Sequence, residues 1–161
     1  MRTERDGCWP SLGVQMTDAV TLTVPLPPPA LRANNRTFWA RKSKAANEYS
    51  EDVWWAWRGQ HCGIIQHTFP DAPLDAANVH YEWRYAGVEP DHSNLGGHTK
   101  YLQDILCLAP KMSLERAVKY TRTHLGLVAD DKGIHATYEA VKVPKRHQEC
   151  VVVTVTRRDD R

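Results

Sequence analysis

The 161-residue sequence lacks any run of about 18 consecutive apolar residues, the minimum for a membrane-spanning helix. Its first residues also lack the apolar stretch that a secretory signal peptide needs. No Cys-x-x-Cys pair occurs among the four cysteines, and no His-Glu-x-x-His pattern occurs among the eight histidines. These absences argue against a membrane protein, a disulfide framework and a zinc site. We therefore expect a protein that stays inside the cell.

The composition that is present is typical of a folded domain. Hydrophobic residues make up 42% and charged residues 25% of the chain, with six tryptophans and six tyrosines. A chain of this length is expected to form one domain with its own core. Residues 1–18 carry no periodic pattern and are predicted to be a flexible lead-in, so the single domain is expected to span residues 19–161.

Alternating apolar and polar residues predict two strands, Val20–Val24 and Val79–Tyr85. Two further runs rich in β-forming residues lie near the end of the chain, at Ile134–Val143 and Cys150–Thr156. Because a short polar turn joins these two runs, they are predicted to pair as an antiparallel hairpin.

Three helices are predicted between the strands. Ser43–Arg58 contains no proline or glycine, and its apolar residues recur at three- and four-residue steps, which favours a core position for Trp57. Ser113 is a plausible N-cap for a helix that ends near His124. The order of elements predicts an α+β domain with helices packed on one mixed β-sheet. The remaining helix, His98–Cys107, is expected to turn four apolar side chains inward: Tyr101, Leu102, Ile105 and Leu106.

Positive charge is concentrated between Leu31 and Ala45, where there is no acidic residue. Two asparagines and the aromatic pair Phe38 and Trp39 stand among the cations. This mixture suits contact with a phosphate backbone and nearby exposed bases, although a solvated basic loop has the same composition. The predicted DNA-binding residues are Arg32, Asn34, Asn35, Arg36, Arg41, Lys42 and Lys44.

Acidic residues stand where predicted elements meet: Asp91 after a strand, Asp104 on the next helix, and Asp130 and Asp131 before another strand. If these ends converge, the carboxylates could hold one Mg²⁺ ion for phosphodiester hydrolysis. Each segment taken singly is also ordinary turn composition. Lys100 could face a scissile phosphate, or it could pair with Asp104 one helical turn away.

In their order, these motifs resemble the RusA-type Holliday junction resolvases, a family common in phages. The matching elements run from about Val20 to Thr156. They are a proline-rich strand exit followed by Asn34-Asn35-Arg36, the helix entry Asp91-His92-Ser93-Asn94, the pair Lys100 and Asp104, and Gly126-x-x-x-Asp130-Asp131 before a strand.

The resemblance implies a homodimeric α+β protein that cleaves four-way DNA junctions in recombination, repair or phage DNA processing. It implies Mg²⁺, for which Mn²⁺ can substitute, and the cytoplasm of a bacterial or phage-infected cell. The implied catalytic residues are Asp91, Lys100 and Asp131, and the implied metal ligands are Asp91, Asp104, Asp130 and Asp131.

Three features depart from the family pattern. Ser93 stands where the family has a second aspartate, and about three extra residues around Gly96-Gly97 separate Asn94 from Lys100. Leu108–Thr123 also has the character of an insertion. The loss of one anionic ligand raises an alternative, a DNA-junction-binding protein whose cleavage activity is weakened. The ligand number separates these alternatives, because the remaining acids suffice for one Mg²⁺ ion and hold a second poorly.

Overall fold

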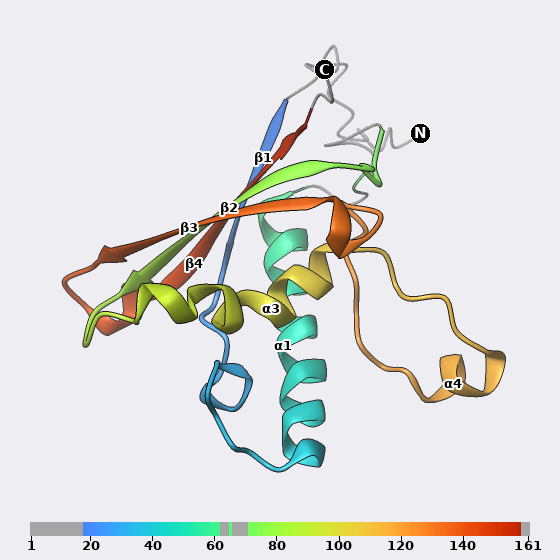
Figure 1. The fold of residues 1–161 in the computed structure, drawn as a ribbon, viewed down its shortest axis with the longest axis horizontal. Helices are drawn as coiled ribbons and strands as arrows, with labels where there is room; N and C mark the ends of the chain where they lie inside the picture. Colours follow the sequence, from blue (N-terminus) through green and yellow to red (C-terminus); the bar gives the residue numbers. More distant parts are fainter. Residues whose placement is uncertain (1–17, 62–64, 66–70, 159–161) are drawn as a thin grey trace, which may run out of the picture.

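The computed structural model describes residues 18–61, 65 and 71–158. The predicted lead-in, residues 1–18, lies outside this range except for Asp18. The main elements are shown in Figure 1. In chain order they are β1 (Ala19–Val24), α1 (Trp39–Gln60), β2 (Ala77–Tyr85), α3 (Leu95–Leu106), α4 (Leu114–Lys119), β3 (Ile134–Lys142) and β4 (Cys150–Arg157), with short 3₁₀ turns η2 (His92–Asn94) and η3 (Asp131–Gly133).

The four strands form one mixed sheet in the order β1-β4-β2-β3. Strand β4 runs antiparallel to both of its neighbours, β1 and β2. Strand β2 runs parallel to β3, with Ala77 opposite Ile134 and Tyr85 opposite Lys142. The predicted α+β class with a mixed sheet is confirmed.

The predicted hairpin between the last two strands is wrong, because β2 lies between β3 and β4. The valine-rich β4 buries every second residue and takes a position with a neighbour on each side, whereas β3 buries none of its residues completely and forms an edge. A parallel pair needs a crossover connection, and the segment from β2 through α3 to β3 supplies it. The strands β3 and β4, which are closest in the sequence, are therefore not neighbours in the sheet.

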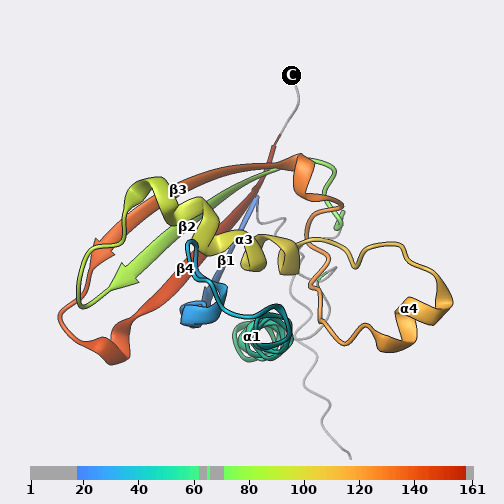
Figure 2. The same cartoon turned by 60° about the horizontal axis from the view of Figure 1, so that its bottom comes forward.

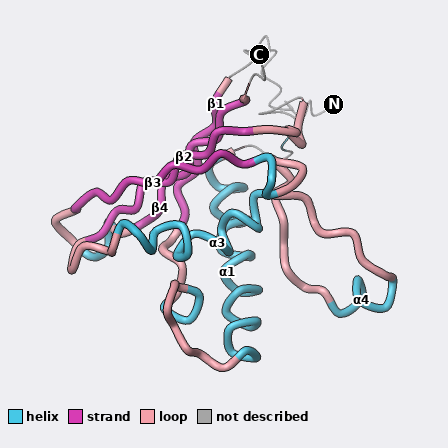
Figure 3. The backbone as a smooth tube through the Cα atoms, viewed as in Figure 1, coloured by secondary structure: helices cyan, strands magenta, loops and turns pink. Residues whose placement is uncertain are grey.

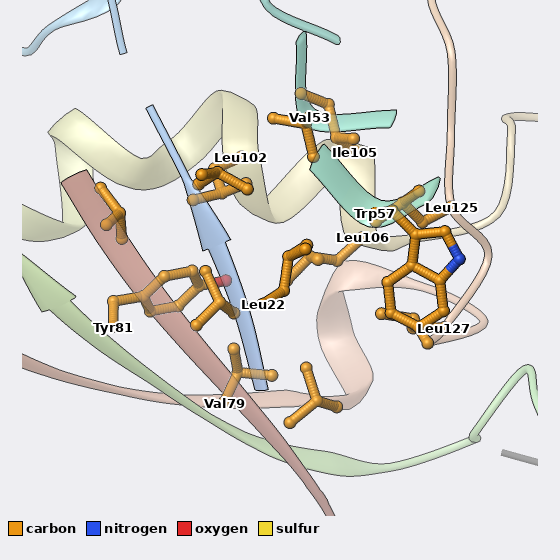
Figure 4. Packing of buried hydrophobic residues seen from close by; sticks show 14 of the residues in the cluster. Leu22, Val53, Trp57, Val79, Tyr81, Leu102, Ile105, Leu106, Leu125 and Leu127 are labelled. Carbon is orange, nitrogen blue, oxygen red and sulfur yellow. The ribbon is translucent and has the colours of Figure 1, made fainter. Parts of the chain in front are cut away.

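Helices α1 and α3 cover the same face of the sheet (Figures 1 and 2). The predicted apolar face of α1 is confirmed, since Ala46, Tyr49, Val53 and Trp57 are buried. These side chains join alternate residues of the strands in one core (Figure 4). The other face of the sheet carries threonines and charged side chains of the strands, so the core formed by the described residues lies on the face that α1 and α3 cover.

Helix α3 begins at Leu95, three residues before the predicted start at His98. The pair Gly96-Gly97 favours a later start in the sequence, but the helix passes through it. A β-carbon on Gly97 would come within 2.8 Å of the Ala33 side chain, so glycine is needed here for close approach. The expected inward residues of this helix are buried except for Tyr101, which is only partly buried.

The predicted helix Ser113–His124 is reduced to the single short helix α4, Leu114–Lys119. All six residues of α4 are exposed, so no apolar face packs against the core to stabilise a longer helix. The chain around α4 is an extended excursion from the body of the fold (Figure 3). No helix among the described residues is both long and apolar enough to cross a membrane.

Candidate functional site

Three of the predicted acidic residues meet where α3 ends and β3 begins. Asp104 lies in the last turn of α3, and Asp130 and Asp131 lie at η3, directly before β3. The connecting chain holds them together, because Val128 forms a parallel bridge with Cys107, and the amide of Leu108 donates to the Val128 carbonyl oxygen at 3.0 Å. The acidic turn is thereby fixed against the end of α3.

A close approach also fixes the position of this acidic turn. The Oδ1 atom of Asp130 accepts a hydrogen bond from the amide of Lys132 at 2.6 Å. A β-carbon on Gly133 would lie 2.1 Å from the carbonyl oxygen of Asp75, so only glycine fits where η3 passes that backbone. The glycine of the sequence Asp-Asp-Lys-Gly therefore lets the turn pack closely against the backbone of the segment before β2.

Electrostatics couple these acids. Burial raises the pKa of Asp104, Lys100 and Arg122 lower it, and the neighbouring Asp131 raises it again. Burial also raises the pKa of the Cys107 thiol to about 12, with Asp131, Asp104 and Asp130 adding to the effect. A half-buried carboxylate beside a second carboxylate is a site that a cation would stabilise.

The acids line one wall of a cavity of about 590 Å³, and the other lining residues include Tyr120, Arg122 and His124. His124 Nδ1 lies 3.0 Å from the carbonyl oxygen of Asp104, which can only accept, so Nδ1 carries the proton. The guanidinium of Arg122 lies 5.6 Å from the centre of the Tyr101 ring, and its buried Nε has no hydrogen-bond partner among the described residues. These three residues were not predicted as part of a site, because the sequence around them indicated only a helix, Ser113–His124.

Asp91 lies apart from the other three acids. It precedes η2 at the start of α3, and the twelve residues of that helix span about 18 Å. Its carboxylate caps η2, accepting from the Ser93 amide at 3.0 Å and from the Asn94 side chain at 3.2 Å. The hydrogen bonds from Ser93 lower its pKa, and His92 and His98 act in the same direction. The structure therefore brings together Asp104, Asp130 and Asp131 and leaves Asp91 at the other end of the helix.

Lys100, the predicted phosphate-facing residue, is exposed in the middle of α3. It lowers the pKa of Asp104, and so its charge acts on the acid cluster. The predicted pair does not form within the described residues, whose five ion pairs do not include Lys100 with Asp104. Contact of Lys100 with a phosphate stays a prediction.

The predicted DNA-binding segment has two parts. Arg32 is held by the fold, since its Nε donates to the Pro27 carbonyl oxygen at 2.9 Å and its guanidinium lies 5.8 Å from the Trp83 ring centre. The Asn35 side chain accepts from the Thr37 amide at 2.9 Å, and Asn34 has φ 65°, so these residues shape the turn before α1.

The second part of the segment is open to solvent. Arg36, Arg41 and Lys44 are exposed and Lys42 is partly exposed. Phe38 and Trp39 are 65% and 72% exposed, with their ring centres 5.7 Å apart. Lys44 lies 3.7 Å from Glu48 in an exposed i,i+4 pair, whereas Arg36, Arg41 and Lys42, which are close to the two rings in the sequence, form none of the ion pairs of the described residues. Cations beside exposed aromatic rings suit contact with phosphates and unpaired bases.

The donor set at the end of α3 suits a hard cation. Carboxylate oxygens from Asp104 and Asp131 are ligands of the kind that Mg²⁺ prefers, and Mg²⁺ completes its shell with water and substrate phosphate oxygens. Within residues 18–61, 65 and 71–158 no group of three or more His, Cys, Asp or Glu side chains is arranged to hold a metal ion. In the described part of the chain, the candidate ligands for such a cation are therefore Asp104 and Asp131.

Comparison with known proteins adds no assignment. No protein-family model matches the chain, and no curated protein matches it.

Proposed function

We propose that this protein is a metal-dependent endonuclease that resolves four-way DNA junctions, with a RusA-like fold and a homodimeric assembly. The observation that carries the proposal is the half-buried Asp104 carboxylate, placed beside Asp131 in the wall of a cavity. The order of motifs in the sequence points to the same chemistry. The proposed setting is recombination, repair or phage DNA processing in the cytoplasm of a bacterial or phage-infected cell.

The two carboxylates favour a divalent cation because the charge of Asp131 adds to the cost of ionising the half-buried Asp104. Bound Mg²⁺ would polarise a phosphate oxygen and lower the pKa of an attacking water. The protein's contribution is to place the Asp104 and Asp131 side chains on one side of the cavity, at the end of α3 and in the turn that Gly133 seats.

Cationic side chains support the phosphate. Lys100 and Arg122 both lower the pKa of Asp104, so both place positive potential at the acid cluster. The same potential stabilises negative charge that develops on a phosphate in the transition state. Arg36, Arg41 and Lys42 lie on a separate surface and would supply affinity for the backbone without sequence preference.

A homodimer suits the substrate. A four-way junction has approximate two-fold symmetry and needs two cuts to be resolved. Two copies of this chain related by a two-fold axis would present two identical sites to the two strands that are cut.

The second candidate function is junction binding with weakened cleavage. Two observations favour it: Ser93 replaces an acid of the family pattern, and the described residues hold no three-ligand group. The two functions share the DNA surface and differ only in metal-dependent chemistry, so a cleavage assay separates them.

The test is incubation of the purified protein with a labelled four-way junction and a linear duplex of the same sequence, in Mg²⁺ and in EDTA. We expect cleavage of the junction only in Mg²⁺, loss of cleavage in Asp104→Asn and Asp131→Asn, and binding in EDTA that stays within a few-fold of wild type. Asp52→Asn, an exposed acid on α1, is the matched control.

The result for Asp91→Asn defines the extent of the site. Cleavage that survives this change would confine the site to the cavity, whereas loss of cleavage would extend it to the start of α3. Cleavage that persists in EDTA, or in both cavity variants, would overturn the metal-dependent mechanism. Metal-independent binding to the junction without any cleavage would establish the second candidate.

A further inference from the structure

The excursion Leu108–Thr123 projects from the body of the fold as an arm that carries α4 (Figures 1 and 2). Both ends of the arm are fixed. Its first residue is hydrogen-bonded to Val128, and at its far end the Thr123 amide donates to the Ser50 hydroxyl at 3.0 Å. The Asn47 side chain also donates to the Thr121 hydroxyl at 2.7 Å. The arm is therefore anchored on α1 and on the segment before β3, while no residue of α4 is buried in the core.

The arm is basic and contains a hollow of its own. It carries four cationic residues and a single acid, Glu115. A hollow of about 470 Å³ lies within it and has no carboxylate in its lining. The lining residues are Pro110, Lys111, Met112, Arg116, Lys119 and Tyr120.

This hollow adjoins the acidic cavity. Pro110, Lys111 and Tyr120 line both spaces, so these residues form the border between them. The Tyr120 ring is held at the border because its hydroxyl is hydrogen-bonded to His124 at 2.6 Å. A ligand that fills the hollow would extend directly toward Asp104 and Asp131.

We propose that the hollow in the arm binds one unpaired nucleotide of a DNA strand. Lys111, Arg116 and Lys119 match the charge of its phosphates, and the Tyr120 ring with Met112 offers a surface for the base. The inference rests on the proposed DNA-binding function and deepens it: a strand with one nucleotide seated in the arm would present the neighbouring phosphate to the acidic cavity. Three cations around an aromatic ring favour a nucleotide over an acidic peptide, because aspartate and glutamate side chains have no aromatic base to stack on the ring.

The opposite face of α4 offers a matched control. Leu114 and Val118 lie one turn apart and are 81% and 78% exposed, and neither lines the hollow. Substitution of these two residues changes the same short helix without changing the hollow. It also tests whether α4 is a contact between two copies of this chain.

The experiment measures binding of a fluorescent single-stranded oligonucleotide by anisotropy in EDTA, over a range of salt concentrations, with a duplex and a four-way junction alongside. The triple variant Lys111→Ala/Arg116→Ala/Lys119→Ala should lower the salt slope for the single strand by about 2, the value for three phosphate contacts. Tyr120→Leu should weaken single-strand binding roughly fivefold to hundredfold. Tyr120→Phe keeps the ring but loses the hydrogen bond to His124 that holds it, so it should weaken binding less than Tyr120→Leu does. The control Leu114→Ser/Val118→Ser should bind as the wild type does.

Each other outcome overturns the inference in a recognisable way. Wild-type affinity in both the triple variant and Tyr120→Leu would exclude the hollow as a DNA site and leave the proposed function standing. A wild-type protein that binds none of the three DNAs would overturn the proposed function as well. Poly-glutamate that binds as tightly as the oligonucleotide would identify an acidic peptide as the ligand. A change of mass in light scattering confined to Leu114→Ser/Val118→Ser, with no effect of the hollow variants on DNA binding, would assign the arm to contacts between copies.

Discussion

The hydroxyl of Tyr120 donates a hydrogen bond to Nε2 of His124, with 2.6 Å between the oxygen and the nitrogen. The direction follows from the other ring nitrogen, which donates to the Asp104 carbonyl oxygen and therefore carries the proton of the neutral ring. Burial lowers the pKa of His124, which keeps the ring neutral at pH 7. One side chain thus ties the arm to the end of α3 and orients a tyrosine at the border of two cavities.

This pair predicts the state of His124 in solution. We expect ¹⁵N spectra at neutral pH to show Nδ1 protonated and Nε2 unprotonated. Tyr120→Phe should leave this tautomer in place, because the Asp104 carbonyl sets it, and should lower the free energy of unfolding by about 1 kcal/mol, since it removes one hydrogen bond. A protonated Nε2 in the wild type would contradict the assigned direction of both bonds.

His98 predicts how folding stability depends on pH. Its Nδ1 accepts from the Ala33 amide at 2.9 Å, and burial, followed by the charge of Arg32, lowers its pKa, while Asp91 opposes the shift. The unfolded chain therefore binds more protons than the folded chain just below pH 6.5, the ordinary value, so this contribution to stability is complete above that pH and is lost as the pH falls.

Denaturant unfolding at pH 7.5 and at pH 5 measures this effect. We expect His98→Asn, whose side-chain oxygen can accept the same hydrogen bond, to reduce the difference between the two pH values. His92→Asn is the control, because His92 is exposed and lies 3.2 Å from Glu89 on the surface. An equal reduction in both variants, or none in His98→Asn, would show that the Ala33 contact does not govern the dependence.

The open part of the basic segment predicts a salt effect. Replacing Arg36, Arg41 and Lys42 with alanine should weaken binding to duplex and junction DNA alike. It should also flatten the plot of log affinity against log salt by roughly one unit for each phosphate that the variant no longer neutralises. Lys142→Ala, an exposed cation on β3, should leave the slope unchanged. A slope that is the same in the triple variant and the wild type would show that this surface does not touch DNA.

Local patterns in the sequence were sufficient for most elements but not for their pairing. The alternation in β1 and β2 and the three- and four-residue steps in α1 predict structures that the fold confirms, because each pattern reflects burial of one face. Which strands are neighbours in the sheet depends instead on which strand is buried at its centre. Seven residues separate β3 from β4, enough to cross the roughly 10 Å over an intervening strand, so closeness in sequence did not decide the neighbour of β4.

The candidate site could also be predicted only in part, because local patterns do not show which distant residues meet. Asp104, Asp130 and Asp131 could be found because they stand at the ends of regular elements. Asp91 has similar sequence context, yet the length of α3 separates it from the other acids. Tyr120, Arg122 and His124 reach the cavity only through the path of the arm, and that path depends on hydrogen bonds between distant residues such as Thr123 and Ser50.

Gly133 predicts the sensitivity of the acidic turn. A β-carbon here would overlap the Asp75 carbonyl oxygen at 2.1 Å, so Gly133→Ala must shift the backbone of η3. We expect a loss of about 1–3 kcal/mol in the free energy of unfolding, together with a loss of cleavage as Asp131 moves away from Asp104. Gly59→Ala, in a helix with open space around the new methyl group, should instead add about 0.5–1 kcal/mol. Equal effects of the two changes would contradict the close approach at Gly133.

Asp104→Asn is expected to stabilise the folded protein while it removes cleavage. Because burial and Asp131 raise its pKa, the ionised form is disfavoured in the folded protein, and Asp104→Asn should raise the melting temperature by a few degrees at pH 7 without metal. The advantage of the variant should shrink as the pH falls through the pKa of Asp104, since the wild-type carboxyl then becomes neutral.

Added Mg²⁺ should reverse the order of the two proteins. A cation that binds only the folded state raises the melting temperature with its concentration, and Asp104→Asn removes one of its two ligands at the end of α3. Thermal unfolding over a Mg²⁺ titration should therefore show a rise in the wild type, an equal rise in the control Asp52→Asn, and little or none in Asp104→Asn. A wild-type melting temperature that is indifferent to Mg²⁺, with Asp104→Asn less stable at every concentration, would mean that the carboxylate supports the fold through Lys100 and Arg122 and does not bind a metal.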